Sequence, residues 1–299
     1  MRQQTQGGAL LLGATLCWGV SIPLSKGLLG GVPPLWLIVW QLMGSVLLLV
    51  AVAAERRLRW WRQAQPVRLG LIGMLEPGMA YGLGFIGLQW TTAVHAAVLF
   101  SAEPFAILIF AALLGGFGPR RQADVGKLLA GIGSMAGVAL IALTDTSAAT
   151  VGSLQGDALV LAGVCCAALY VALTARQVQA GSALGLLIVQ QFGSLLLAVC
   201  ALVLWGAPRH SFSAQPVGDI LAAMAVGMLQ FALAFWLYLE GLKRAGASFW
   251  SVFVLNLTPL IGVASSALLL GEPLGPAVLL GGGLIVSAAV YLHAREQRG

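Results

Sequence analysis

Two glutamates, each followed directly by a proline, are the residues of this sequence that could best do chemistry. Glu103-Pro104 lies in the stretch FSAEPFAILIF and Glu76-Pro77 in the stretch MLEPGM. A charged side chain at the centre of a membrane costs about 3 kcal/mol on insertion scales, and a proline inside a helix leaves a backbone carbonyl without its partner. If both stretches lie in a membrane, each combines the cost of a buried charge with the cost of a lost helical hydrogen bond. A sequence that keeps both costs at one place indicates a function.

A carboxyl group in an apolar span could bind a cation or a proton. Loss of water disfavours its charged form, so it can hold a proton when empty and release it when an ammonium group arrives. For Glu103 the alternative is a protonated plug that hydrogen-bonds a freed carbonyl. Glu76 has small residues at helical spacing, Gly73, Ala80 and Gly87, which also suit close packing of helices.

The composition is that of an integral membrane protein. The chain has 299 residues, of which 59% are hydrophobic and 9% charged, and its mean hydropathy is +0.93, whereas soluble domains carry about 25% charged residues. Apolar windows long enough to cross a bilayer core of ~30 Å lie at about 8–30, 33–53, 67–88, 92–114, 125–143, 156–175, 182–204, 217–239, 247–270 and 274–292. The sequence therefore predicts an all-α protein with ten transmembrane helices.

The basic residues fall almost entirely on one side of these predicted spans. All but Lys26 and Arg209 of the 16 lysines and arginines lie on the side of the two termini. Because basic loops stay in the cytoplasm, we expect a multi-pass protein of the cell inner membrane with both termini cytoplasmic. This placement explains the net charge of +6 without a nucleic acid partner.

The chain contains an internal repeat of about half its length. The stretch QLMGSVLL from Gln41 resembles QQFGSLLL from Gln190, and Glu103-Pro104 corresponds to Thr258-Pro259. Five spans per half is an odd number, so the second copy must enter the membrane from the opposite face. We therefore expect one membrane domain made of two inverted five-helix repeats, 1–148 and 149–299.

Inverted repeats are typical of secondary transporters, whose substrate site lies near the midplane of the membrane and is formed in part by interrupted helices. Prolines inside the predicted spans are candidate hinges: Pro23, Pro77, Pro104 and Pro259. Besides the two glutamates, polar and aromatic residues of the spans are candidates for substrate binding or coupling: Trp18, Tyr81, His95, Phe100, Tyr170, Gln190, Trp250, Asn256 and Thr258.

Several of these residues have a simpler interpretation. His95 lies near the predicted outer end of its span, where an interfacial histidine is an alternative to a pH sensor. Gln190 and its counterpart Gln41 could hydrogen-bond between helices rather than line a cavity. Asn256 begins a glycosylation sequon, but its depth in the span excludes that use and leaves a helix contact or a substrate contact.

Enzyme chemistry finds no support in the sequence. Residues 82–87 fit the pattern G-x-G-x-x-G but lie inside an apolar span, whereas a dinucleotide loop needs a strand before it. The four cysteines all lie in apolar windows, which argues against disulfides and zinc. We therefore expect no enzyme, no cofactor and no metal site.

Motifs spread over the whole chain resemble a known superfamily. GLKRAGAS from Gly241, Pro259 and LLLGE from Leu268 are similar to the second-half signature of the drug/metabolite transporter superfamily (EamA-type ten-span transporters). GLQWTTA from Gly87 resembles the first-half counterpart, and Trp18-Gly19 resembles the first span. Within the superfamily the chain most resembles the aromatic amino acid exporters, although Gln41 stands where many relatives carry an arginine.

The resemblance implies ten spans in a five-plus-five inverted repeat and a transport function. We expect an exporter of amino acids, with aromatic and other nonpolar ones preferred, that works by alternating access, and protons are a candidate coupling ion. One alternative is an exporter of drug-like cations or a metabolite transporter of the same superfamily. A more remote one is a membrane-embedded enzyme or scaffold. The expected partners are amino acids and the lipid bilayer, and a monomer is compatible with the sequence.

Overall fold

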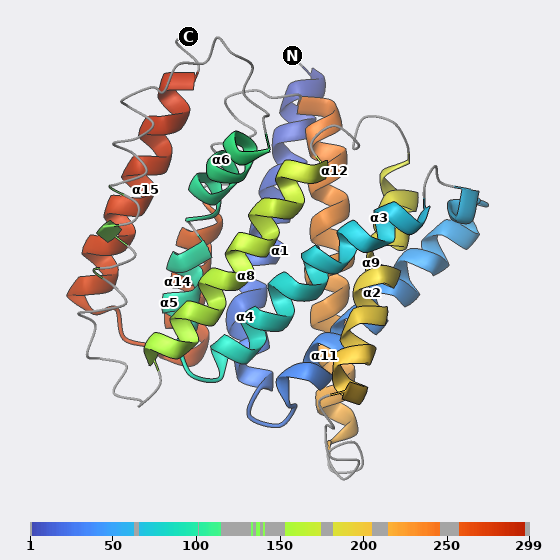
Figure 1. Cartoon of the computed structure of the whole chain (residues 1–299), viewed down its shortest axis with the longest axis horizontal. Helices are drawn as coiled ribbons and strands as arrows, with labels where there is room; N and C mark the ends of the chain where they lie inside the picture. Colours follow the sequence, from blue (N-terminus) through green and yellow to red (C-terminus); the bar gives the residue numbers. More distant parts are fainter. Residues whose placement is uncertain are drawn as a thin grey trace.

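The computed structural model is a bundle of helices (Figure 1). It describes residues 2–62, 66–100, 102–114, 133, 136–137, 140, 153–174, 182–204, 215–245 and 257–296. Within these residues all regular structure is helical and no strand occurs. The predicted all-α class is therefore confirmed for the part of the chain that the structure describes.

The helices of the first half are α1 (Arg2–Leu28), α2 (Pro34–Glu55), the 3-10 turn η1 (Trp60–Arg62), α3 (Pro66–Gly73), the π-helical η2 (Met74–Met79), α4 (Ala80–Leu88), α5 (Ala93–Phe100) and α6 (Glu103–Leu113). Those of the second half are α8 (Ser153–Thr174), α9 (Ala183–Leu204), α11 (Val217–Gly227), the π-helical η3 (Met228–Leu233), α12 (Ala234–Ala245), α14 (Thr258–Leu270) and α15 (Pro276–Glu296).

Six segments of the described chain are long and apolar enough to cross a membrane: Gln6–Leu28, Pro34–Glu55, Pro66–Leu88, Leu154–Leu173, Ala183–Leu204 and Val217–Arg244. The other predicted spans are seen only in shorter pieces. The window 92–114 consists of two short helices, α5 and α6, and most of the window 125–143 lies outside the described residues. The structure thus supports a multi-pass membrane protein.

The prolines of the spans stand in three different settings. Pro23 lies inside α1, which continues through it. Pro77 lies in η2, next to a Glu76 with the extended backbone angles φ −143° and ψ 126° and joined to it by a cis peptide bond. Pro104 and Pro259 do not interrupt a helix, because each stands in the first turn of one, α6 and α14, where its missing N–H costs no helical hydrogen bond.

Two close helix crossings join the halves of the chain. At one, α3 packs on α9; at the other, α11 packs on α2. A Cβ atom on Gly73 would overlap the backbone of Gln190, and one on Gly227 would overlap the backbone of Gln41. Glycine therefore allows α3 to lie close to α9 and α11 to lie close to α2. The internal repeat around Gln41 and Gln190 thus extends to the helices that cross these residues.

Both ends of the described chain lie at one end of the bundle. Figure 1 shows α1 beginning and α15 ending at the same end, where α12 also finishes. An even number of membrane crossings requires this arrangement. The last turn of α12 carries Lys243 and Arg244, so basic residues gather at this end, as the sequence predicts.

Candidate functional site: a buried cluster of carboxyl groups, tyrosines and aromatic rings

The two glutamates of the Glu-Pro pairs meet inside the bundle. Glu76 is 8% exposed and belongs to η2, and the half-buried Glu103 begins α6. Their carboxyl groups are close enough to interact electrostatically. Two carboxylates near each other in a buried place would repel each other if both were charged.

Three tyrosines surround the carboxyl groups. Tyr81 of α4, Tyr170 of α8 and Tyr238 of α12 are each within electrostatic reach of Glu76, and Tyr81 and Tyr238 also of Glu103. Five elements, η2, α4, α6, α8 and α12, thus direct polar groups to one place. Tyr81 and Tyr170 were predicted as lining residues, and the structure places Tyr81 near both glutamates and Tyr170 near Glu76.

Aromatic rings continue from the tyrosines. Tyr81 packs edge-on against Phe231, with ring centroids 4.8 Å apart, and lies 6.4 Å from Phe100. Trp18 of α1 packs edge-on against Phe235 at 5.1 Å. Such ring pairs suit a site that receives an apolar or aromatic group.

Two buried glutamines connect to the tyrosines. The hydroxyl of Tyr170 donates to Oε1 of Gln190 at 2.9 Å, and the side chains of Tyr81 and Gln230 hydrogen-bond. Ser25 of α1 also donates to Gln230, at 3.5 Å. Gln190 of α9 is therefore joined to Tyr170 of α8 by a hydrogen bond between two helices.

Some polar atoms of the bundle are buried without a hydrogen-bond partner among the described residues. They are Nε1 of Trp18, Nε2 of Gln190 and Oε1 of Gln41. A buried polar atom costs free energy unless something pairs with it. These atoms are therefore available to a bound polar molecule or to water.

Small residues position the polar ones. Ala80 and Gly87 of α4 lie against Gly163 and Gly156 of α8, so closely that a Cβ on either α8 glycine would overlap the backbone of α4. Gly73 makes the corresponding contact with α9. The stripe of small residues around Glu76 is thus a packing surface, as the sequence allowed, and it holds Tyr81 and Glu76 beside α8 and α9.

His95 does not belong to this cluster. Its side chain is buried, at 2% exposed. Its Nδ1 lies 3.2 Å from Oδ2 of Asp157. The histidine, near the start of α5, therefore faces α8.

The remaining predicted residues are not placed in the cluster. Thr258 is half-buried in the first turn of α14. Trp250 and Asn256 lie outside the described residues. The structure also adds residues that sequence reasoning missed: Gln230, Phe231, Phe235 and Tyr238 in the cluster, and Asp157 beside His95.

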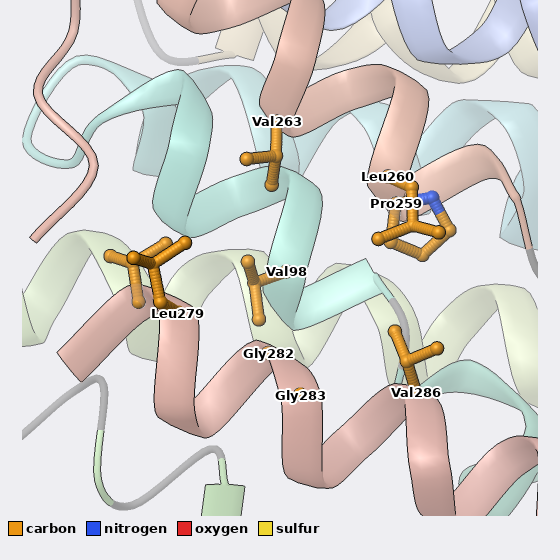
Figure 2. Close-up of a pocket in the computed structure, with 9 residues that line it drawn as sticks. Val98, Pro259, Leu260, Val263, Leu279, Gly282, Gly283 and Val286 are labelled. Carbon is orange, nitrogen blue, oxygen red and sulfur yellow. The ribbon is translucent and has the colours of Figure 1, made fainter. Parts of the chain in front are cut away.

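A small pocket lies away from the carboxyl groups. It has a volume of about 90 Å³ and lies between α5, α14 and α15 (Figure 2). Val98, Pro259 and Val263 line it together with leucines, valines and glycines, and none of the cluster residues does. Its lining offers only apolar contacts.

The profile of the EamA-like transporter family matches the chain twice, over residues 5–143 and 154–293. The chain belongs to the EamA-like transporter family. The two matches follow the internal repeat, and the family places the chain in the drug/metabolite transporter superfamily. The carboxyl cluster is accordingly the candidate site of an EamA-like membrane transporter.

Two relatives agree with this assignment, and a solved structure shares the fold. Two proteins of Bacillus subtilis (strain 168) are similar: "Uncharacterized transporter YyaM", 25% identical over 93% of this chain and 90% of its own length, and "Uncharacterized transporter YvbV", 29% identical over 98% and 93%. A crystal structure that covers 99% of both chains superposes with a TM-score of 0.65 at 18% identity, which shows the fold.

Proposed function

We propose that this EamA-like transporter exports amino acids, with aromatic and other nonpolar ones preferred, by alternating access between two inverted halves in the cell inner membrane. The observation that carries the proposal is the meeting of Glu76 and Glu103 inside a wall of aromatic rings. Such a site offers a negative charge and an apolar surface together, which are the two features that a nonpolar amino acid needs.

The carboxyl groups would receive the ammonium group of the substrate. When empty, the pair would hold a proton, because two buried carboxylates repel each other. The arriving ammonium would replace that proton as the positive charge. Proton release on substrate binding would couple transport to a proton gradient, with Glu103 as the principal group.

Two buried donors would receive the carboxylate of the substrate. Nε1 of Trp18 and Nε2 of Gln190 have no acceptor among the described residues. Trp18 lies 5.4 Å from Tyr238, ring to ring, and Gln190 bonds Tyr170. Both donors therefore border the tyrosine cluster. The carboxylate of the substrate would satisfy them in this chain, which has Gln41 where many relatives carry an arginine.

An exporter of drug-like cations is the second candidate function. A carboxyl pair with aromatic rings would also hold an organic cation by charge and by cation–π contact. Competition separates the two: a carboxylate-free amine that matches the amino acid in shape should compete poorly if Trp18 and Gln190 bind the carboxylate, and equally well if the site takes cations in general.

Efflux from proteoliposomes tests the proposed function. Vesicles are loaded with a panel of labelled amino acids and efflux is followed with and without a pH gradient. We expect phenylalanine, tyrosine, tryptophan and leucine to leave faster than aspartate or lysine, with rates that respond to the gradient. Equal loss of all amino acids from protein-containing and empty vesicles would reject amino acid export.

A further inference from the structure

The densest group of basic residues in the chain follows the end of α2. Between positions 55 and 68 the sequence has one acidic residue, Glu55, and five arginines: Arg56, Arg57, Arg59, Arg62 and Arg68. Because α1 leads away from the end of the bundle that holds both termini and α2 returns to it, these residues lie at that end (Figure 1). We call residues 56–61 the basic turn, and the transport proposal uses none of them.

Backbone hydrogen bonds define the path of the basic turn. The backbone N–H of Arg57 donates to the carbonyl of Ala54 at 3.0 Å, and that of Leu58 donates to the carbonyl of Ala53 at 2.8 Å. These two bonds make a Schellman motif at the end of α2, and the side chain of Leu58 packs on the hydrophobic core. The chain therefore leaves the helix in one defined direction, with its arginines already placed.

Arg57 stands where a glycine is usual. It takes the C′ position of the motif and has a φ of 52°, in the left-handed region that residues other than glycine and asparagine seldom adopt. Backbone strain of this kind tends to be kept at functional positions. An arginine at this position is thus explained by its side chain and not by its backbone.

Aromatic rings hold the basic turn against the second half of the chain. Trp60 stacks on Phe192 of α9, with ring centroids 5.3 Å apart and an angle of 17° between the planes. Trp61 packs edge-on against Trp60 at 5.8 Å and is 60% exposed. Exposed tryptophans at the end of a span are typical of the interface between lipid headgroups and acyl chains. The basic turn therefore lies at the level of the headgroups.

The arginines of the turn differ in what they contact. The guanidinium of Arg56 lies over the ring of Trp236 of α12, 5.2 Å from its centroid, so the protein itself uses this charge. The side chains of Arg57 and Arg59 are exposed and make no hydrogen bond or ion pair with the residues that the structure describes. Two guanidinium groups are therefore available to an anion from outside the protein.

An exposed apolar surface continues from the basic turn along α3. Val67 and Leu71 are 76% and 57% exposed, and residues four apart lie on the same face of a helix. An anionic phospholipid has the matching chemistry. Its phosphate suits guanidinium groups, which bind it through paired hydrogen bonds, and its acyl chains suit the exposed valine and leucine.

We propose that the basic turn binds the headgroup of an anionic phospholipid through Arg57 and Arg59. The phosphate accepts hydrogen bonds from both guanidinium groups. The ring of Trp61 lies beside the glycerol, and an acyl chain follows Val67 and Leu71. Basic residues that cluster directly beside a transmembrane helix attract anionic lipids, and here the turn gives them a fixed geometry.

The bound lipid also acts on the contact between the two halves. Trp60 and Arg56 hold the turn, which belongs to the first half, against α9 and α12 of the second. A ligand stabilises the conformation to which it binds. Anionic lipid at the basic turn therefore stabilises the arrangement of the halves that the structure shows.

Contact quenching tests the lipid site. A fluorophore is attached to Val67→Cys in a chain whose four cysteines are alanine, and nanodiscs are made from phosphatidylcholine with increasing fractions of brominated phosphatidylglycerol or brominated phosphatidylcholine. Bromine on an acyl chain quenches the fluorophore only when the two are in contact. We expect half-maximal quenching at an at least about threefold lower fraction of the anionic lipid than of the neutral one.

A second reporter position is the control. Leu268→Cys of α14 is 84% exposed and lies on the other side of the bundle from the end of α2 and the start of α3 (Figure 1). The two lipids should quench a fluorophore there equally. The same preference for phosphatidylglycerol at both reporters would mean that anionic lipid collects around the whole protein, and this would overturn a site at the basic turn.

Matched variants assign the preference to the two arginines. Arg57→Gln combined with Arg59→Gln removes both charges and keeps hydrogen-bonding side chains, so the two lipids should quench the reporter on Val67→Cys alike. Arg244→Gln is the control, because this guanidinium is 3.8 Å from Glu240 within α12 and lies at the same end of the bundle. It should keep the wild-type preference. A preference that survives the loss of both turn arginines would overturn the proposal.

Measurements on the unaltered turn cover the case in which the double variant does not fold. Salt screens exposed charges, so the preference for phosphatidylglycerol should fall between about 0.05 M and about 0.5 M sodium chloride, while quenching by phosphatidylcholine stays the same. Inorganic phosphate, added at constant ionic strength, should leave the lipid in place. If the preference ignores salt, or if inorganic phosphate displaces the lipid and the arginines thus bind a soluble anion, the lipid site is rejected.

Discussion

The two halves of this transporter have an irregular turn at matching positions, but the turns differ in backbone and in the residue that they present. In the first half η2 (Met74–Met79) is kinked at Glu76, whose backbone is extended, and in the second half the π-helical η3 (Met228–Leu233) carries Gln230 at the matching position. Glu103 and Thr258 also differ in charge, and each stands in the first turn of its helix. The repeat thus reproduces the place of these features, while charge at these two pairs of positions comes from the first half.

This difference shows that the symmetry of the backbone does not extend to the charges of the candidate site. The crossings of α3 on α9 and of α11 on α2 match in their packing. A carboxyl group opposite an amide makes the site electrically one-sided, so the proton and the ammonium would be bound by the first half. Exchanging residues between matching positions tests this difference.

The largest effect is expected at the pair Glu103 and Thr258. Glu103→Gln keeps shape and hydrogen bonding but cannot ionise, so we expect it to lower amino acid efflux by at least about tenfold, or ~1.4 kcal/mol, while the protein stays folded. Thr258→Val, at the matching position, should transport within about twofold of wild type. Wild-type efflux by Glu103→Gln between about pH 6 and pH 8 would make Glu103 a structural plug.

The second effect concerns the matching glycines, Gly73 and Gly227. Alanine at either position would push a methyl group into the backbone of Gln190 or Gln41, and overpacking of this kind costs about 1–3 kcal/mol. We expect both variants to lower the midpoint of thermal unfolding in detergent by similar amounts. Gly82→Ala is the control, since a Cβ there meets nothing within 4 Å. A lower unfolding midpoint in only one of the two variants would mean that the two helix crossings are not equivalent.

The third prediction compares Glu76 of η2 with Gln230 of η3. Glu76→Gln makes the first half resemble the second and should slow efflux several-fold, less than Glu103→Gln, because one carboxyl group remains. Gln230→Glu in the same chain restores a carboxyl group beside Tyr81 and should recover part of the rate. If efflux by the double variant is no faster than efflux by Glu76→Gln, η2 and η3 do not face a common site.

The smallest effect is expected at the prolines that begin α6 and α14. Pro104→Ala and Pro259→Ala should slow efflux by about twofold to threefold with little loss of folded protein, because a first-turn proline stiffens the chain where it enters the helix. Pro23→Ala is the comparison inside a continuous helix. Unchanged efflux in both first-turn variants would remove these prolines from the transport cycle.

Much of the cluster could be predicted from the sequence, since an ionisable or polar residue in an apolar span is conspicuous. Glu76, Glu103, Tyr81, Tyr170 and Gln190 were found in this way, and the structure brings them together. Gln230 could have been found by extending the repeat from Gly73 and Gly227, because it stands 154 residues after Glu76.

Other features of the structure could not be predicted from the spacing of residues in the sequence. Tyr238 has no signal of its own, because a tyrosine near the end of a span equally suits the membrane interface. The contact of His95 with Asp157 could not be predicted, because it depends on which helix covers the histidine, and here that helix is α8. A local bend was predicted at Pro104, and the described helix α6 begins one residue before it, at Glu103.

The irregular segments η2 and η3 also bear on where each half can bend. In η2 the helix is interrupted by the extended backbone of Glu76, whereas η3 is a π-helical turn within a continuous run of helix. A helix interrupted by an extended residue can change direction there more easily than one with a single π-helical turn. The first half therefore has a jointed span where the second half has a continuous one.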